Sequence, residues 1–227
     1  HKYDMAEDEY NEAITIYRKS AERNPDAFLD DVAWNLTCLA NLHIDLHKYT
    51  LAEEECNEAL DVYRKLARKK PDAIMPYLAH TLGRIAFIHE KLQDYVLAEN
   101  EYNEVYEIMC KLSNQNPYVF LHKLANIIVN LANIHRDLHK YDLAKEKYEE
   151  ALSIYRRLAE KNPDAYMPEV ASSIWSLAVL HCDLHKYSFA EEEYNEALDI
   201  YRKLAEMNPD VFLPDVANSL GNLASLH

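Results

Sequence analysis

The chain repeats its own pattern at a spacing of 46 residues, and no other feature restricts its fold as strongly. The tripeptide HKY occurs at positions 1, 47, 139 and 185, and QDY occupies the same phase at position 93. Three further positions keep this spacing without an insertion: Pro25, Pro71, Pro117, Pro163 and Pro209; Tyr3, Tyr49, Tyr95, Tyr141 and Tyr187; and Ala40, Ala86, Ala132, Ala178 and Ala224. A repeat of this size buries its apolar side chains only by stacking on its neighbours. We therefore expect residues 1–227 to form a single repeat array, and the missing initiator methionine indicates a piece of a longer protein.

Each repeat contains two stretches with the spacing of amphipathic α-helices. In residues 30–46, which we name the A helix, the apolar face consists of Val32, Ala33, Leu36, Leu39, Ala40, His43 and Leu46. In residues 50–69, the B helix, it consists of Ala52, Cys56, Ala59, Leu60, Tyr63 and either Leu66 or Ala67. This spacing predicts helices, and the presence of only 2 glycines disfavours a mixed α/β enzyme. We therefore expect an all-α fold built from helix pairs.

Prolines mark where these helices end. The residue before a proline avoids the α conformation, so Lys70-Pro71 and its counterparts end the B helix. We expect the stretch NPDAF at 24–28 to be a connector. We also expect Pro76, Pro168 and Pro214 to lie in the first turn of the A helix, where a missing N–H is tolerated.

The stretch HRDLH at 135–139 suggests two kinds of active chemistry. A protein-kinase catalytic loop needs an asparagine where this chain has Asp142, and it needs a D-F-G motif that the chain lacks. His135 and His139 could share a metal ion, but the repeat predicts a helix end between them, and a zinc site needs further ligands. We expect no catalytic residue, no metal site and no cofactor, and we interpret both histidines as structural.

The repeat resembles the tetratricopeptide repeat. Leu39-Ala40-x2-His43 stands for the family pattern L-G-x2-Y, and Ala52-x3-Cys56-x2-Ala59 stands for A-x3-F-x2-A. The period exceeds the family's usual 34 residues, which is similar to the long-helix variants of bacterial repeat proteins and kinesin light chains. The resemblance implies a right-handed superhelical solenoid of antiparallel helix pairs whose A helices line the concave side.

One departure from the family pattern gives a local prediction. The glycine often found in the turn between the A and B helices is replaced here by His47, Gln93, His139 and His185. Histidine tolerates the left-handed conformation better than most residues. We therefore predict a positive φ at these positions.

Comparison of the repeats with one another separates two faces of the A helix. Positions 34, 37, 38, 41 and 44 and their counterparts differ between repeats, whereas the apolar positions recur. These positions share one side of a helix, which we name the variable face. Because a packed face has to recur with its neighbours, we expect the variable face to meet solvent or a ligand.

The variable face is our candidate binding surface. Both tryptophans of the chain lie on it, together with arginines and asparagines, and Trp and Arg are favoured in protein interfaces. Its predicted partner-binding residues are Trp34, Thr37, Asn41, His80, Arg84, Phe87, Asn126, Asn130, Asn133, Arg136, Ser172, Trp175, Ser176, Asn218 and Asn222. The family's carboxylate clamp also uses lysines, which this face lacks. We therefore expect a non-enzymatic scaffold that binds a peptide or protein, but not through a terminal carboxylate.

A second hypothesis assigns the array to a larger signalling protein, as a sensor or oligomerisation segment that associates head to tail through its terminal helices. Charge and cysteine content restrict both hypotheses. A formal net charge of −15 disfavours nucleic acid and acidic membrane surfaces. The 4 cysteines show no paired spacing, as expected of reduced thiols in a cytoplasmic protein.

Overall fold

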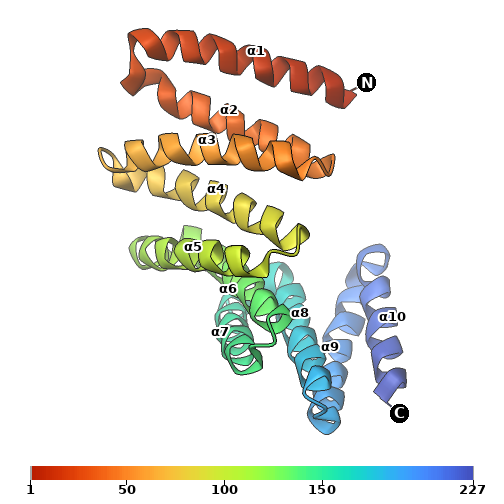
Figure 1. The fold of residues 1–227 in the computed structure, drawn as a ribbon. Helices are drawn as coiled ribbons and strands as arrows, with labels where there is room; N and C mark the ends of the chain where they lie inside the picture. Colours follow the sequence, from red (N-terminus) through yellow and green to blue (C-terminus); the bar gives the residue numbers. More distant parts are fainter. Residues whose placement is uncertain (1, 227) are drawn as a thin grey trace. The chain divides into compact units, whose positions relative to one another are not determined.

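The computed structural model describes residues 2–226, which form ten α-helices and no strand (Figure 1). The helices are α1 (Lys2–Arg23), α2 (Pro25–Asp45), α3 (Tyr49–Ala67), α4 (Pro71–Lys91), α5 (Tyr95–Gln115), α6 (Pro117–Asp137), α7 (Tyr141–Ala159), α8 (Pro163–Asp183), α9 (Tyr187–Met207) and α10 (Pro209–Leu226). The even-numbered helices are A helices and the odd-numbered helices are B helices.

Contacts between helices divide the chain into two compact units. The first contains α1 to α5 and ends at Gln115, and the second begins at Asn116 and contains α6 to α10. Within each unit, every helix packs on the next helix of the chain, and the two run antiparallel. The predicted all-α class of repeated helix pairs is thus confirmed, whereas the single array remains a prediction.

The A helices begin earlier than predicted, because the proline that recurs in every repeat is their first residue. Asn24 has φ −141°, outside the helical region, and α2 begins at Pro25 and not at residue 30. A proline suits the first helical position, because the backbone N–H that proline lacks has no partner within the helix there. The prediction that NPDAF is a connector is therefore wrong, since all of it after Asn24 belongs to α2. The first-turn prediction is also wrong for the prolines that lie inside α4, α8 and α10, namely Pro76, Pro168 and Pro214.

The turn from each A helix to its B helix has the predicted backbone. The values of φ are 57° at His47, 62° at Gln93, 58° at His139 and 57° at His185. At the end of α2, the Lys48 N–H donates to the His43 carbonyl at 2.8 Å, and the His47 N–H donates to the Ile44 carbonyl at 2.9 Å. This pair of bonds is a Schellman motif, which satisfies carbonyls that the helix end would leave unpaired.

Buried alanines bring the helices close together. Ala33, Ala40, Ala52 and Ala59 have 0% exposure, which means that neighbouring side chains cover them completely. Large side chains such as Tyr63 fill the remaining space. The predicted apolar faces of α2 and α3 are buried, apart from half-buried positions at 46 and 67. None of the helices in the described part of the chain is both long and apolar enough to cross a membrane.

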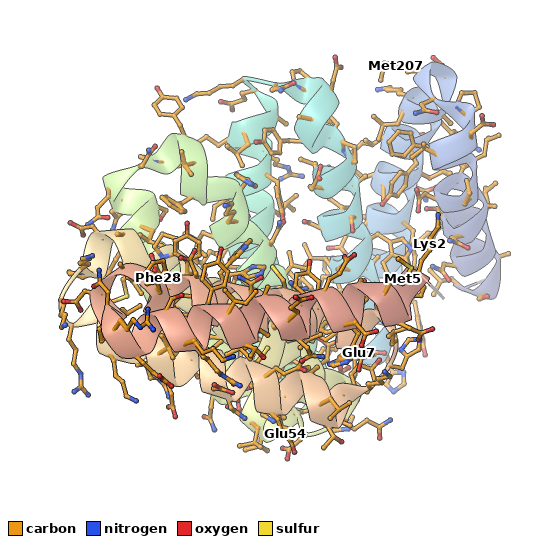
Figure 2. All side chains as sticks on the ribbon, turned by 90° about the horizontal axis from the view of Figure 1, so that it is seen from above. Lys2, Met5, Glu7, Phe28, Glu54 and Met207 are labelled. Carbon is orange, nitrogen blue, oxygen red and sulfur yellow. The ribbon has the colours of Figure 1, made fainter. Side chains whose placement is uncertain are left out.

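The outer surface carries charged residues of the B helices. Figure 2 shows Glu54 pointing outward from α3. Ion pairs connect successive B helices within each unit, and they are Arg18–Glu58, Arg64–Glu104 and Arg156–Glu196. Their side chains are about half exposed, so each pair contributes at most about 1 kcal/mol.

Two substitutions test the turn between A and B helices. Gln93→Gly should raise the free energy of unfolding by about 0.5–1 kcal/mol, because glycine adopts a positive φ without strain. His47→Gly should gain less, since it also removes the contact between His47 Nδ1 and the Tyr49 hydroxyl at 3.0 Å. Urea unfolding followed by circular dichroism measures both values. Loss of stability in Gln93→Gly would contradict this account of the turn.

Candidate functional site

One position of the variable face is exposed in every A helix. It is occupied by Trp34, His80, Asn126, Ser172 and Asn218. Trp34 retains 45% exposure, which is high for so large an apolar side chain. All but two of the other predicted residues of this face are half-buried. The half-buried residues are Asn41, Arg84, Phe87, Asn130, Asn133, Arg136, Trp175 and Asn222.

The two exceptions are Thr37 and Ser176, which are buried, so the prediction that they lie at the surface is wrong. Thr37 is 1% exposed, and its hydroxyl donates to the Ala33 carbonyl at 2.9 Å and lies 3.2 Å from the Thr81 hydroxyl on α4. Ser176 is 9% exposed and donates to the Ser172 carbonyl. A position can differ between repeats because its packing differs, so variation alone does not indicate contact with solvent.

Tyrosine hydroxyls of the B helices form hydrogen bonds with residues of the variable face. The comparison of repeats did not predict these contacts. In the second unit, the Tyr148 hydroxyl donates to Asn133 and the Tyr155 hydroxyl donates to Asn126. Burial raises the pKa of Tyr148 to about 12, so the phenol stays protonated and able to donate. The sequence did contain a signal for these contacts, because a tyrosine on a buried face needs a hydrogen-bond acceptor for its hydroxyl.

The half-buried aromatic and arginine side chains also have internal contacts. The Arg84 guanidinium lies 5.9 Å from the centre of the Phe87 ring in the first unit. In the second unit, Arg136 lies 3.9 Å from Asp183, and Trp175 packs edge-on against Tyr194 with ring centres 6.3 Å apart. These side chains are therefore held in place by the fold.

The first unit has a pocket of about 260 Å³ beside the exposed tryptophan. It is lined by Asp30, Asp31 and Trp34 of α2, by Tyr63 of α3 and by Tyr77 of α4. The ring centres of Trp34 and Tyr77 are 5.7 Å apart, and their planes meet at 80°. Of these residues, the sequence comparison selected only Trp34. Position 77 does differ between repeats, and this was the signal for Tyr77.

A larger depression of about 650 Å³ lies between α7, α8 and α9 of the second unit. Charged side chains form much of its lining. Arg156 is already paired with Glu196 at 2.9 Å.

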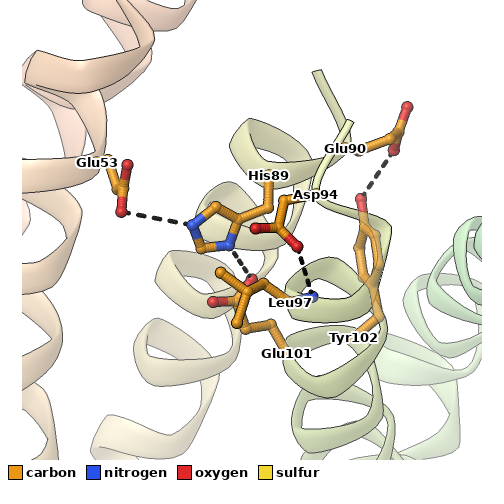
Figure 3. Close-up of polar contacts among 7 residues, drawn as sticks. All are labelled: Glu53, His89, Glu90, Asp94, Leu97, Glu101 and Tyr102. Carbon is orange, nitrogen blue, oxygen red and sulfur yellow. Dashed lines mark hydrogen bonds and ion pairs between the residues drawn. The ribbon is translucent and has the colours of Figure 1, made fainter. Parts of the chain in front are cut away.

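The recurring histidine of the A helix connects three helices. Figure 3 shows the ring of His89 between Glu53 of α3 and Glu101 of α5. Its Nδ1 lies 2.8 Å from Glu101 Oε2, and its Nε2 lies 3.4 Å from Glu53 Oε1. His43 repeats the arrangement, at 2.9 Å from Glu55 and 3.5 Å from Glu7. These contacts explain why the position keeps a polar residue in an apolar face.

The two histidines of the stretch HRDLH lie on different structural elements. His135 is buried in α6, and helix α6 ends at Asp137, before His139. The His139 Nδ1 lies 2.8 Å from the Tyr141 hydroxyl in the following turn. No cluster of three or more His, Cys, Asp or Glu side chains in residues 2–226 could hold a metal ion.

The contacts of His89 change its protonation. Burial favours the neutral ring, but the hydrogen bonds and charges of Glu101 and Glu53 outweigh it, so the pKa of His89 is raised above 6.5. Burial also raises the pKa of Glu101 above 4.5, against the opposing effect of His89. The folded protein therefore binds protons here more tightly than the unfolded chain does.

Comparisons with known proteins agree with this architecture. The tetratricopeptide repeat family model matches residues 123–203. The comparison with curated protein sequences finds no match.

Among solved structures, BtubC (BKLC) from P. vanneervenii is 23% identical with a TM-score of 0.73, and the alignment covers 100% of this chain and 83% of that chain. A Rap protein complexed with Competence and Sporulation Factor is 16% identical with a TM-score of 0.61, and this chain spans 62% of its length while being covered completely. A kinesin-light-chain-like protein of Podospora anserina with nearly identical TPR-like repeats is 14% identical, with a TM-score of 0.65 over 90% of this chain and 94% of that one. At these identities the likeness concerns the fold.

The raised pKa of His89 predicts a pH-dependent stability. Its contribution is fully present below the unfolded value of 6.5 and is lost as pH rises through the higher folded value. The free energy of unfolding of the wild type should therefore fall, relative to that of His89→Gln, as pH rises above 6.5. Glu101 acts in the same direction at lower pH, starting from 4.5.

Urea unfolding of both proteins between about pH 5.5 and 8.5 measures this difference. His47→Gln is the matched control, because His47 lies exposed in a turn. A difference between wild type and His89→Gln that stays constant over this range would contradict the assignment.

Proposed function

We propose that this chain, a repeat protein of the tetratricopeptide type, is a non-enzymatic scaffold that binds a peptide or protein partner through the variable face of its A helices. One observation carries the proposal. The position of Trp34 is exposed in all five A helices of residues 2–226, yet it carries a different kind of residue in most of them. Recurring residues hold the fold, so side chains that are exposed and do not recur are free to serve recognition.

The chemistry of these side chains suits a protein ligand. Trp34 and Tyr77 expose 45% and 44% of their surface, and large aromatic side chains supply much of the binding energy in protein interfaces. Arg84 and Phe87 of α4 add a second aromatic and basic pair to the variable face of the first unit. The asparagine and serine side chains in the second unit provide hydrogen bonds instead. The two units therefore offer different surfaces.

The comparisons support a bound partner without identifying it. The Rap protein, which shares the fold, was crystallised with Competence and Sporulation Factor. We place the scaffold in the cytoplasm, because Cys38, Cys56, Cys110 and Cys182 are free thiols. The scaffold chemistry requires no cofactor.

Two face variants locate the binding surface. Trp34→Ala with His80→Glu alters the first unit, and Ser172→Lys with Asn218→Lys alters the second. Pull-down from an extract of the source cells, with quantitative mass spectrometry, should show a partner whose capture falls about tenfold or more in at least one variant, as expected for the loss of interface hot spots.

The control variant carries Glu54→Lys and Glu192→Lys, both exposed on B helices. It should capture the partner as the wild type does, and circular dichroism should show that all variants are folded. Equal capture by both face variants, with loss in the control, would place binding on the outer surface and contradict the proposal.

A further inference from the structure

The pocket of the first unit is lined by aromatic rings from three helices. The planes of Trp34 and Tyr77 meet nearly at a right angle, and Tyr77 stacks on Tyr63 with ring centres 5.9 Å apart and planes inclined by 18°. Tyr63 is 1% exposed, so it supports Tyr77 from inside the fold. At about 260 Å³ the pocket is smaller than those that hold drug-sized ligands. Its size suits a single side chain.

Two carboxylates stand at this pocket without a basic partner. Asp30 and Asp31 lie one turn before Trp34 on α2, and neither forms an ion pair with any described residue. Asp30 Oδ1 accepts a hydrogen bond only from the Asp31 N–H, at 3.2 Å. By contrast, Asp26 of the same helix is paired with Lys69 at 2.6 Å. The charge at the pocket is therefore uncompensated by the protein.

The equivalent place in the second unit is built differently. There the Tyr155 hydroxyl donates to Asn126, which occupies the position of Trp34. An indole cannot accept such a bond, and the buried Tyr63 hydroxyl makes no hydrogen bond of good geometry to a described residue. The neighbouring Thr37 hydroxyl is already engaged by Ala33 and Thr81. The first unit thus gives up an internal hydrogen bond where it gains an aromatic wall.

We infer that this pocket binds the ammonium group of a lysine side chain, methylated or not, in the partner protein. The faces of aromatic rings attract cations, and Trp does so most strongly. The Asp30 and Asp31 carboxylates would complete the charge balance, whereas a neutral or acidic side chain would leave them unpaired. The inference rests on the proposed function, because it names the side chain that the partner inserts.

Trp34 fluorescence measures this binding directly in a Trp175→Phe background, because the chain contains 2 tryptophans. The probe is Nα-acetyl-lysine methylamide, together with its trimethylated form. The matched probe is Nα-acetyl-norleucine methylamide, which lacks only the charged nitrogen. Both lysine probes should bind saturably and about tenfold or more tightly than the norleucine probe. Added salt should weaken their binding.

Three variants in the same background identify the groups involved. Tyr77→Ala and the nearly isosteric Asp30→Asn with Asp31→Asn should each weaken lysine binding about fivefold or more. Asp26→Asn, outside the pocket, should leave it unchanged. The asparagine variant keeps the test decisive if Tyr77→Ala does not fold. Equal binding of the lysine and norleucine probes, an absent response, or an unaffected asparagine variant would overturn the inference.

The outcomes separate this inference from the proposed function. If the first unit captures a partner but the lysine probes do not bind at Trp34, the scaffold function stands and the ammonium pocket is refuted. If the lysine probes bind as described and no partner depends on either face variant, the pocket's affinity for an ammonium group stands, but its role toward a scaffold partner is refuted together with the proposed function.

Discussion

Close packing of helices at buried alanines is the constraint on which the other features of this protein depend. Ala33, Ala40, Ala52 and Ala59 have no exposed surface, so the backbones of neighbouring helices approach closely at these points. Close approach fixes which side chains point into the core and which lie on the variable face. The recurring alanines thus determine the positions of all residues that we assign to binding.

Polar groups join the helix pairs without weakening this packing. His89 contacts glutamates of two B helices through its two ring nitrogens, which gives a buried imidazole acceptable partners in an apolar face. His43 bonds Glu55 through Nδ1, and its Nε2 lies 3.5 Å from Glu7. The ion pairs on the outer surface are about half exposed and contribute far less. The histidine contacts are therefore buried polar links between successive B helices of the first unit, and the raised pKa of His89 makes its link sensitive to pH.

The sequence was sufficient to predict the helix pairs and the turn between them. Recurring apolar positions specify the helices, and the left-handed turn at His47 follows from the residues that tolerate it. The start of α2 was misplaced because the proline was interpreted only as a signal that ends the preceding helix, whereas Pro25 is also the first residue of α2. Comparison of repeats could show that a position differs, but not whether it is exposed. This is why buried Thr37 was included among the candidate binding residues. Tyr77 was missed because the pocket joins three helices, and only the folded chain brings these residues together.

The measurement that tests the packing account most directly introduces leucine at two positions and compares the stabilities of the two variants. Ala40→Leu adds bulk where helices touch, and Ser172→Leu adds the same side chain to the exposed variable face. Ala40→Leu should lower the free energy of unfolding by about 1–3 kcal/mol or more, and Ser172→Leu by less than about 0.5 kcal/mol. Equal losses at both positions would contradict the division between a face that holds the fold and a face that is free to bind.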